Sequence, residues 1–223
     1  GPKAAQGMEL RGRLIAHDLH SVGVDVNCAP MLDVATPDSH EFILNRCYGY
    51  NPETVATNGR ALAEGMVQGG VLSVIKHIPG HGRAQLDSHF ELPCLDTPLA
   101  ALQSIDFAPF KALNDLPMAM TAHIIYAALD PDHCATLSPT VINAIRSDMG
   151  FDGLLMTDDL SMKALSGSFG ERTTASLNAG CDVVLHCNGD PAEMDPILAE
   201  TPNLTGPAAA RASAALAQRC APD

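Results

Sequence analysis

Apolar residues recur along the chain in two alternating patterns, short continuous runs and longer stretches with a helical period. The continuous runs are rich in Val, Ile, Leu and Met, as buried parallel strands are. They predict strands at residues 22–30, 71–75, 118–122, 154–157 and 183–185. The periodic stretches predict helices at residues 3–19, 51–68, 99–113, 138–149, 171–179 and 207–219.

Several predicted helices carry recognisable start and stop signals. Asn51-Pro52-Glu53 combines a capping side chain, a proline at the first helical position and an acidic first turn. Ser138-Pro139 repeats the cap and the proline, and Gly150 and Gly180 each follow the end of a helical pattern. Helices and buried strands therefore alternate, which indicates an α/β fold with a parallel sheet.

The chain shows no linker, low-complexity segment or internal repeat, so residues 1–223 are expected to form a single domain. The alternation fits either a barrel or a doubly wound sheet. A (β/α)8 barrel has eight strands and typically about 250 residues, whereas five strands are visible here. Gly1-Pro2 also leads straight into a helix, so we expect an N-terminal part of the fold to be absent from this sequence.

The composition limits the classes of partner and the cellular compartment that we expect for this chain. The chain has 26 Asp plus Glu against 13 Lys plus Arg, which gives a formal charge of −13. A surface that acidic repels nucleic-acid phosphates and anionic lipid headgroups, so neither is an expected partner. No apolar run approaches the roughly 18 residues of a membrane span, and no signal peptide is visible. The seven cysteines are odd in number and irregularly spaced, which favours a reducing cytoplasm over a disulfide framework.

Each predicted strand is followed by polar side chains. In chain order they are Asn27 and Asp33, Lys76 and His77, His123, Asp158 and Asp159, and His186 and Asn188. The carboxyl ends of parallel strands lie on one face of an α/β fold. We therefore expect these groups to converge and to form an active site there.

The loop after the second strand is rich in histidine. His77 and His81 have the H-x-x-x-H spacing that binds zinc when it lies on a helix. Pro79 and Gly80 lie between them, so a loop is predicted and the helical zinc geometry does not apply. No metal and no other cofactor is therefore expected.

Two further motifs carry carboxylates. In Asp87-Ser88-His89, the aspartate is close enough to hold the imidazole and tune it as a general acid/base, although a surface loop is an equal alternative. Asp158 and Asp159 follow the strand at 154–157, and only one can point into the mouth of a barrel because neighbouring side chains alternate. A carboxylate there is a nucleophile, a metal ligand or a cap for the next helix.

Three segments together resemble a known enzyme family. They read K-H-I-P-G-H-G at residues 76–82, D-S-H at 87–89 and T-D-D-L-S-M at 157–162. On these motifs the chain resembles bacterial β-N-acetylhexosaminidases of glycoside hydrolase family 3, of the peptidoglycan-recycling type. The likeness extends from about Leu10 to Cys187.

The resemblance implies a (β/α)8 barrel catalytic domain without a metal. It implies a retaining exo-β-N-acetylglucosaminidase that removes terminal non-reducing GlcNAc from muropeptide fragments (GlcNAc-1,6-anhydro-MurNAc peptides) in cell-wall recycling. In that reaction Asp158 would be the nucleophile and His89 the acid/base, held by Asp87. A carboxylate and a second proton-transferring group are what retaining hydrolysis requires.

The resemblance also implies the sugar contacts. Arg46, Lys76 and His77 would contact the N-acetylglucosamine hydroxyls, and His123 would lie near the site. The expected partner is therefore a small carbohydrate. The sequence around Arg46 reads L-N-R-C where the family has Gly-Asp-Arg, and nothing matches the family's Asp-Gln-Glu-Gly-Gly segment.

Other interpretations remain open. An incomplete barrel would expose unpaired strand edges, so self-association or a strand swap is expected if the barrel is not completed. One alternative is a truncated barrel that binds sugar or a partner without turnover. Another is a metal-dependent barrel hydrolase that uses His77, His81, His89 and Asp158.

Overall fold

The computed structural model describes residues 2–86, 88 and 90–222. The strands are β1 (Val26–Asn27), β2 (Leu72–Ile78), β3 (Cys94–Leu95), β4 (Met118–Thr121), β5 (Ile125–Tyr126), β6 (Leu154–Asp159) and β7 (Val183–Leu185). The α-helices are α1 (Pro2–Ser21), α2 (Glu41–Leu44), α3 (Pro52–Gln68), α4 (Leu99–Ala101), α5 (Ala108–Ala112), α6 (Pro139–Ser147), α7 (Phe169–Ala179), α8 (Pro191–Glu200) and α9 (Gly206–Leu216).

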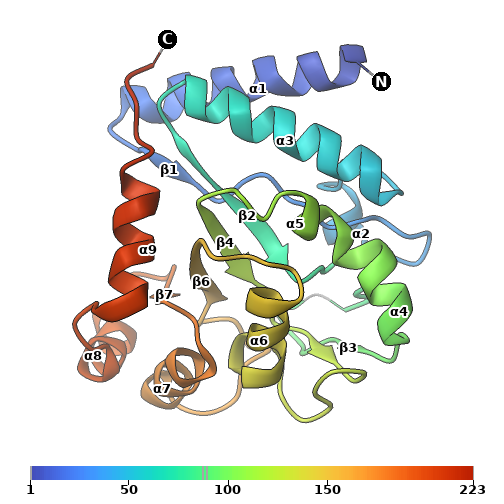
Figure 1. The fold of residues 1–223 in the computed structure, drawn as a ribbon. Coiled ribbons are helices and arrows are strands. Elements are labelled where there is room, and N and C mark those ends of the chain that lie inside the picture. The colour runs from blue at the N-terminus through green and yellow to red at the C-terminus, as the bar shows by residue number, and fades with distance from the viewer. Residues whose placement is uncertain (1, 87, 89, 223) are drawn as a thin grey trace.

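Within the described part of the chain, five parallel strands form one curled sheet in the order β1-β2-β4-β6-β7 (Figure 1). β3 and β5 pair separately as a short parallel ribbon. The expected α/β fold is confirmed, and so is the strand order along the chain. The sheet is an open one with β1 and β7 at its edges, so an eight-stranded closed barrel is not observed in this part of the chain.

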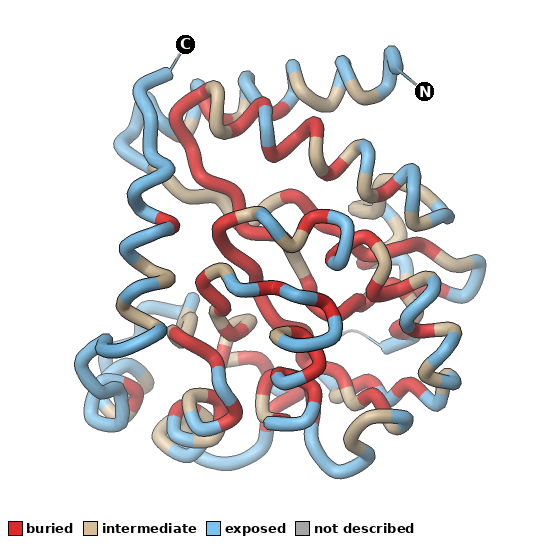
Figure 2. Tube along the Cα trace, in the orientation of Figure 1, coloured by how far each residue is buried: buried red, intermediate tan, exposed pale blue. Residues whose placement is uncertain are grey.

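Apolar side chains cover both faces of the sheet. One large cluster joins Ile75, Ala119 and Leu155 to the helices that follow the strands. On the opposite face, Leu72 and Met118 pack with Ala215 of α9. Figure 2 shows the consequence: buried residues follow the strands, while α8 and α9 are mostly exposed.

The helix signals act as expected. The Asn51 side chain accepts a hydrogen bond from the Thr54 N–H at 2.8 Å, at the start of α3. Ser138 caps α6 in the same way. Gly180 follows α7 with φ at +113°, a left-handed conformation that glycine adopts without steric cost.

The first helix packs closely on α3. A Cβ on Gly65 would meet the Glu9 carbonyl oxygen, and one on Gly12 would meet that of Leu62. Glycine at both positions therefore lets the two backbones approach at their crossing. Among the described helices, none is both long and apolar enough to cross a bilayer.

Two predicted elements differ from the structure, and some elements of the structure were not predicted. The strand expected over residues 22–30 is reduced to Val26–Asn27, followed by an isolated bridge at Met31. The helix expected over residues 99–113 is interrupted by a π-helical stretch before α5. Pro109 explains that break, since it offers no N–H for a helix continuing through it. Helix α8 and the β3–β5 ribbon were not predicted.

Candidate active site

A cavity of about 220 Å³ opens at the carboxyl ends of β2 and β6. Four of the side chains assigned from the sequence line it, namely Arg46, Lys76, His77 and Asp158. Larger hollows lie over α1 and along residues 83–97, but the ionisable side chains that the motifs singled out gather here. The remaining lining residues are Phe42, His81, Ser88 and Met162.

An irregularity in β2 brings two neighbouring side chains to the cavity. The pairing register between β2 and β4 shifts between Ile75 and Ile78. A regular strand would turn successive side chains to opposite faces, and such an irregularity interrupts that alternation. Lys76 and His77 therefore both line the cavity, although they are adjacent in sequence.

Below the cavity, Asp33 organises the histidine-rich loop. Its carboxylate is fully buried, accepts a hydrogen bond from His77 Nδ1 at 2.7 Å and accepts the His81 backbone N–H at 2.6 Å. Burial alone would raise its pKa, but His77 and the His81 N–H hold the pKa of Asp33 below its usual value. Asp33 therefore stays ionised, fixes the tautomer of His77 and leaves the Nε2 atom of that ring for a ligand.

Close backbone packing lets the loop reach Asp33. A Cβ on Gly82 would meet the carbonyl oxygen of Val34. Any larger residue at position 82 would push the loop away from the segment that carries Asp33. The close approach of the two backbones thus explains why a glycine stands at the end of K-H-I-P-G-H-G.

Asp158 is the carboxylate that faces the cavity. Burial would raise its pKa, but the neighbouring His77 and His123 and the Asp159 N–H outweigh it, so the pKa of Asp158 is lowered. The Asp159 N–H lies 2.9 Å from Asp158 Oδ1. An ionised carboxylate held in this way can act as a nucleophile or stabilise positive charge.

Asp159 has a different task. Its carboxylate accepts the Ser161 N–H and hydroxyl, at 2.9 and 2.6 Å, and the Cys187 N–H at 3.1 Å. It therefore holds the loop after β6 against the loop after β7. The sequence-based expectation that only one acid of the pair faces the site agrees with this division.

His123 lies behind Asp158 and does not line the cavity. Its Nε2 donates to the Asp159 carbonyl oxygen at 3.0 Å, and its Nδ1 lies 2.8 Å from the Thr136 hydroxyl. Since a carbonyl oxygen only accepts, Nε2 carries the proton and Nδ1 accepts from Thr136. Burial lowers the pKa of His123, so the ring is neutral and supports the strand end from below.

Two basic side chains, Lys76 and Arg46, line the same cavity as Asp158. Burial and the neighbouring Arg46 guanidinium lower the pKa of Lys76, while Asp158 partly restores it. The Arg46 guanidinium lies 4.8 Å from the centre of the Phe42 ring, within the range of a cation–π contact. A cavity lined by hydrogen-bond donors and a carboxylate suits a ligand rich in hydroxyl groups.

The strand ends converge only in part. The ends of β2, β4 and β6 meet around Asp33 and Asp158, as expected. Asn27 instead contacts the sulfur of Met66, and His186 lies 3.2 Å from Glu193, away from the cavity. All seven cysteines are free thiols.

Two of the predicted site residues, Asp87 and His89, lie outside the described residues. Between them, Ser88 is described and lines the cavity, where its Oγ lies 3.2 Å from His81 Nε2. Among the described residues, no cluster of three or more His, Cys, Asp or Glu side chains could hold a metal ion.

Sequence reasoning gave no role to Asp33 or Ser88. Asp33 was named only as a polar residue after a strand, and its distance of 44 residues from His77 hid their contact. The signal for it was its position shortly after the predicted strand at residues 22–30.

The family model for the glycosyl hydrolase family 3 N terminal domain matches residues 3–214 of the chain. The chain belongs to glycoside hydrolase family 3. A curated β-hexosaminidase from Bordetella avium is 37% identical over 216 residues, which cover 95% of this chain and 61% of that protein. One from Neisseria meningitidis serogroup C is 38% identical over 79% of this chain and 50% of its own length. The chain therefore spans half to three fifths of these family 3 relatives.

Solved family 3 structures share the fold. NagZ from Neisseria gonorrhoeae, in complex with N-trifluoroacetyl-D-glucosamine, superposes with a TM-score of 0.86 at 33% identity, over 96% of this chain and 62% of NagZ. The same protein in complex with zinc ion gives 0.83. A family 3 β-N-acetylglucosaminidase from Paenibacillus sp. gives 0.88 at 30% identity, over 96% of this chain and 44% of that one.

Proposed function

We propose that the protein is a retaining exo-β-N-acetylglucosaminidase that removes terminal non-reducing GlcNAc from muropeptide fragments. The single observation that carries the proposal is Asp158, an ionised carboxylate at a strand end, which lines a small cavity together with Arg46 and Lys76. The names of the relatives support the sugar, because they are β-hexosaminidases. The curled parallel sheet is consistent with part of a (β/α)8 barrel, which we include in the proposal.

Asp158 is the nucleophile in this proposal. Its carboxylate attacks the anomeric carbon as the bond to the leaving oxygen breaks, and a glycosyl-enzyme forms. Water then attacks that carbon and releases Asp158 as a carboxylate. The neighbouring His77 and the Asp159 N–H favour the ionised form that the first step needs.

The acid/base role belongs to His89, held by Asp87. In the first step the imidazolium of His89 gives its proton to the leaving oxygen, and in the second the neutral ring takes a proton from water. This assignment rests on the D-S-H motif. It is supported by Ser88, the residue between the two, which lines the same cavity as Asp158.

Arg46, Lys76 and His77 are the proposed sugar ligands, with His123 supporting Asp158 from below. A volume of about 220 Å³ is below the range of roughly 300–1,000 Å³ typical of drug-sized ligands, so it suits one terminal sugar ring and an exo mode of action. The N-trifluoroacetyl-D-glucosamine bound to NagZ supports an N-acylated sugar here.

The test uses a fluorinated N-acetylglucosaminide that accumulates as a glycosyl-enzyme. Intact mass is measured before and after incubation, and the adduct is mapped by peptide sequencing. A single sugar adduct on Asp158 is the expected result. An active protein with no adduct, or with an adduct elsewhere, would show that the nucleophile assignment is wrong.

Three further measurements separate the other interpretations. A metal-dependent hydrolase would lose turnover in a chelator, whereas the proposed mechanism predicts no change. A barrel that only binds sugar would give neither turnover nor adduct while still binding N-acetylglucosamine in a calorimeter. Self-association of the chain remains a prediction and is tested by its sedimentation coefficient.

A further inference from the structure

One buried hydrogen bond links the K-H-I-P-G-H-G loop to the D-S-H segment. His81 Nε2 lies 3.2 Å from Ser88 Oγ. Both residues are almost completely buried, with 1% and 2% of their surface exposed. Burying a hydroxyl and an imidazole costs free energy unless they bond to each other. The contact is therefore part of the packed structure and not a chance meeting on the surface.

The histidine side of this bond is rigid. The backbone N–H of His81 donates to the buried Asp33 carboxylate at 2.6 Å. Its ring packs edge-on against His77, with 5.3 Å between the centroids. Burial and the neighbouring His77 lower the pKa of His81 to about 4. A neutral imidazole can form this hydrogen bond to a hydroxyl without placing a buried charge in the loop.

The described residues around Ser88 have other contacts, among them a cation–π contact of the Lys163 ammonium with Phe90, 5.7 Å from the ring centre. The Ala84 carbonyl oxygen accepts the His40 N–H at 3.0 Å, and Leu92 packs against an apolar cluster under the loop after β6. Phe90 is 65% exposed. Among the described residues from 85 to 91, Ser88 is the one whose side chain contacts the wall of the cavity.

We propose that His81 is a positioning residue: its hydrogen bond holds Ser88, the middle residue of the D-S-H motif, in the wall of the Asp158 cavity. This inference rests on the proposed function and deepens it. In the sequence Ser88 is the direct neighbour of both acid/base candidates, Asp87 and His89. The acid/base step of the proposed function therefore depends on where Ser88 is held.

The proposal predicts a leaving-group dependence. Poor leaving groups need protonation in the first step, whereas good ones depart without it. The Ser88→Ala variant should therefore lose about fivefold to tenfold in kcat/KM on an alkyl N-acetylglucosaminide, the scale of one lost hydrogen bond. It should lose little on a dinitrophenyl N-acetylglucosaminide. KM should change little, because Ser88 is assigned no sugar contact.

Variants separate positioning from general disruption. Ser88→Thr keeps the hydroxyl and should restore the rate on the alkyl glycoside. In a double-mutant cycle, His81→Gln combined with Ser88→Ala should lose no more than the larger single loss. Ser104→Ala is the matched control, an exposed serine bonded only to the Ala101 carbonyl oxygen, and it should behave as the parent protein. Equal losses on both substrates, or fully additive losses, would overturn the proposal.

A second readout does not depend on turnover. Hydrogen exchange of peptides covering residues 84–93 should speed up in Ser88→Ala relative to the parent and to Ser104→Ala. Unchanged exchange there would refute the tether whatever the activity. If the parent protein hydrolyses no N-acetylglucosaminide but exchange responds as expected, the proposed function fails and the tether stands.

Discussion

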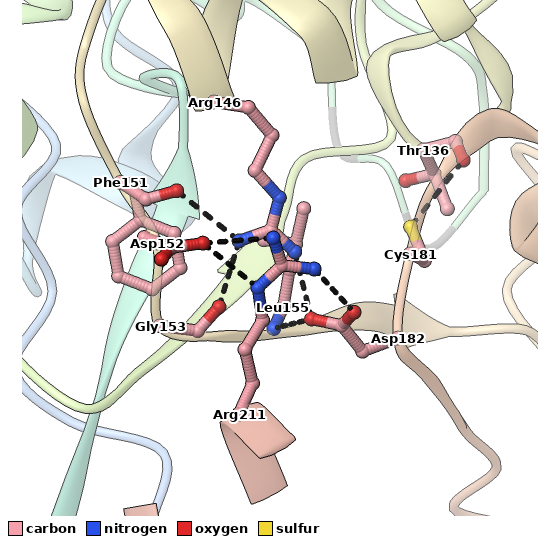
Figure 3. A network of polar contacts seen from close by, with 9 residues as sticks. All are labelled: Thr136, Arg146, Phe151, Asp152, Gly153, Leu155, Cys181, Asp182 and Arg211. Carbon is pink, nitrogen blue, oxygen red and sulfur yellow. Dashed lines mark hydrogen bonds and ion pairs between the residues drawn. The ribbon is translucent and has the colours of Figure 1, made fainter. Parts of the chain in front are cut away.

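An aspartate lies at each end of the sheet, buried Asp182 at one and half-buried Asp158 at the other, and the two are used differently. At the amino ends of β6 and β7, Asp182 accepts Arg146 Nη2 at 2.7 Å, the Leu155 N–H at 2.8 Å and Arg211 Nη1 at 3.1 Å (Figure 3). Both of its oxygens are paired with groups that belong to the protein. Figure 3 shows the Arg146 side chain reaching this carboxylate from above and the Arg211 side chain from below.

At the carboxyl end of the same β6, Asp158 is held less completely. The Asp159 N–H donates to one oxygen, and the carboxylate faces a cavity. The charges around it favour ionisation, but the side chain keeps capacity for a ligand. Near its amino end β6 thus contacts a structural aspartate whose oxygens are both paired. At its carboxyl end it carries an aspartate that can still accept a ligand, and in parallel α/β barrels the active site lies at that end of the strands.

The largest expected effect would test the carboxyl end. Asp158→Asn should lower kcat by at least about a thousandfold, because the amide cannot attack the anomeric carbon. Its midpoint of unfolding should stay close to that of the parent. The control is Asp159→Asn, whose parent side chain caps a loop away from the cavity and whose loss in kcat should be far smaller. The assignment fails if both variants lose equally.

The next effect belongs to the amino end. Asp182→Ala leaves Arg146 and Arg211 without their shared carboxylate and the Leu155 N–H without its acceptor, so it should cost about 3–5 kcal/mol of unfolding free energy. Urea titration measures this directly. A loss below about 1 kcal/mol would mean that the network is not structural.

The pH dependence of stability should distinguish the ends further. The pKa of His81 is about 4 in the fold, against 6.5 in a model peptide. The folded state therefore binds fewer protons between these values, so this stabilisation is complete above pH 6.5 and is lost as the pH falls through 4. The loss should reach at most about 3 kcal/mol. His81→Gln should flatten that part of the curve, and an unchanged slope in that variant would contradict the assignment of the effect to His81.

The smallest effect should come from the rim of the amino-end network. Asp152 pairs with Arg211 at 2.7 Å, but its side chain is 87% exposed. Exposed pairs contribute about 0–1 kcal/mol, so Asp152→Ala should change the unfolding free energy by less than that. High salt should remove even this difference. A loss as large as that of Asp182→Ala would erase the distinction between buried and rim carboxylates.

Local patterns predicted the elements well where one signal dominated. A single residue marks each of three helix ends. The Asn51 and Ser138 side chains cap the starts of α3 and α6, and the left-handed backbone of Gly180 follows the end of α7. The break before α5 was not predicted, although Pro109 marks it in the sequence. The register shift in β2 depends on the pairing of this strand with β4, which no local pattern records.

By itself, the sequence determined the α/β class, the order of the strands and the motifs of family 3, because these depend on periodicity and on residue identity. Only the tertiary structure decided that Asp33 holds His77 and His81, that Asp158 rather than Asp159 faces the cavity, and that Ser88 reaches His81. Those contacts join segments distant in the chain or depend on the register of a strand. They depend on hydrogen bonds between groups that folding buries side by side, and burial exists only once the chain has folded.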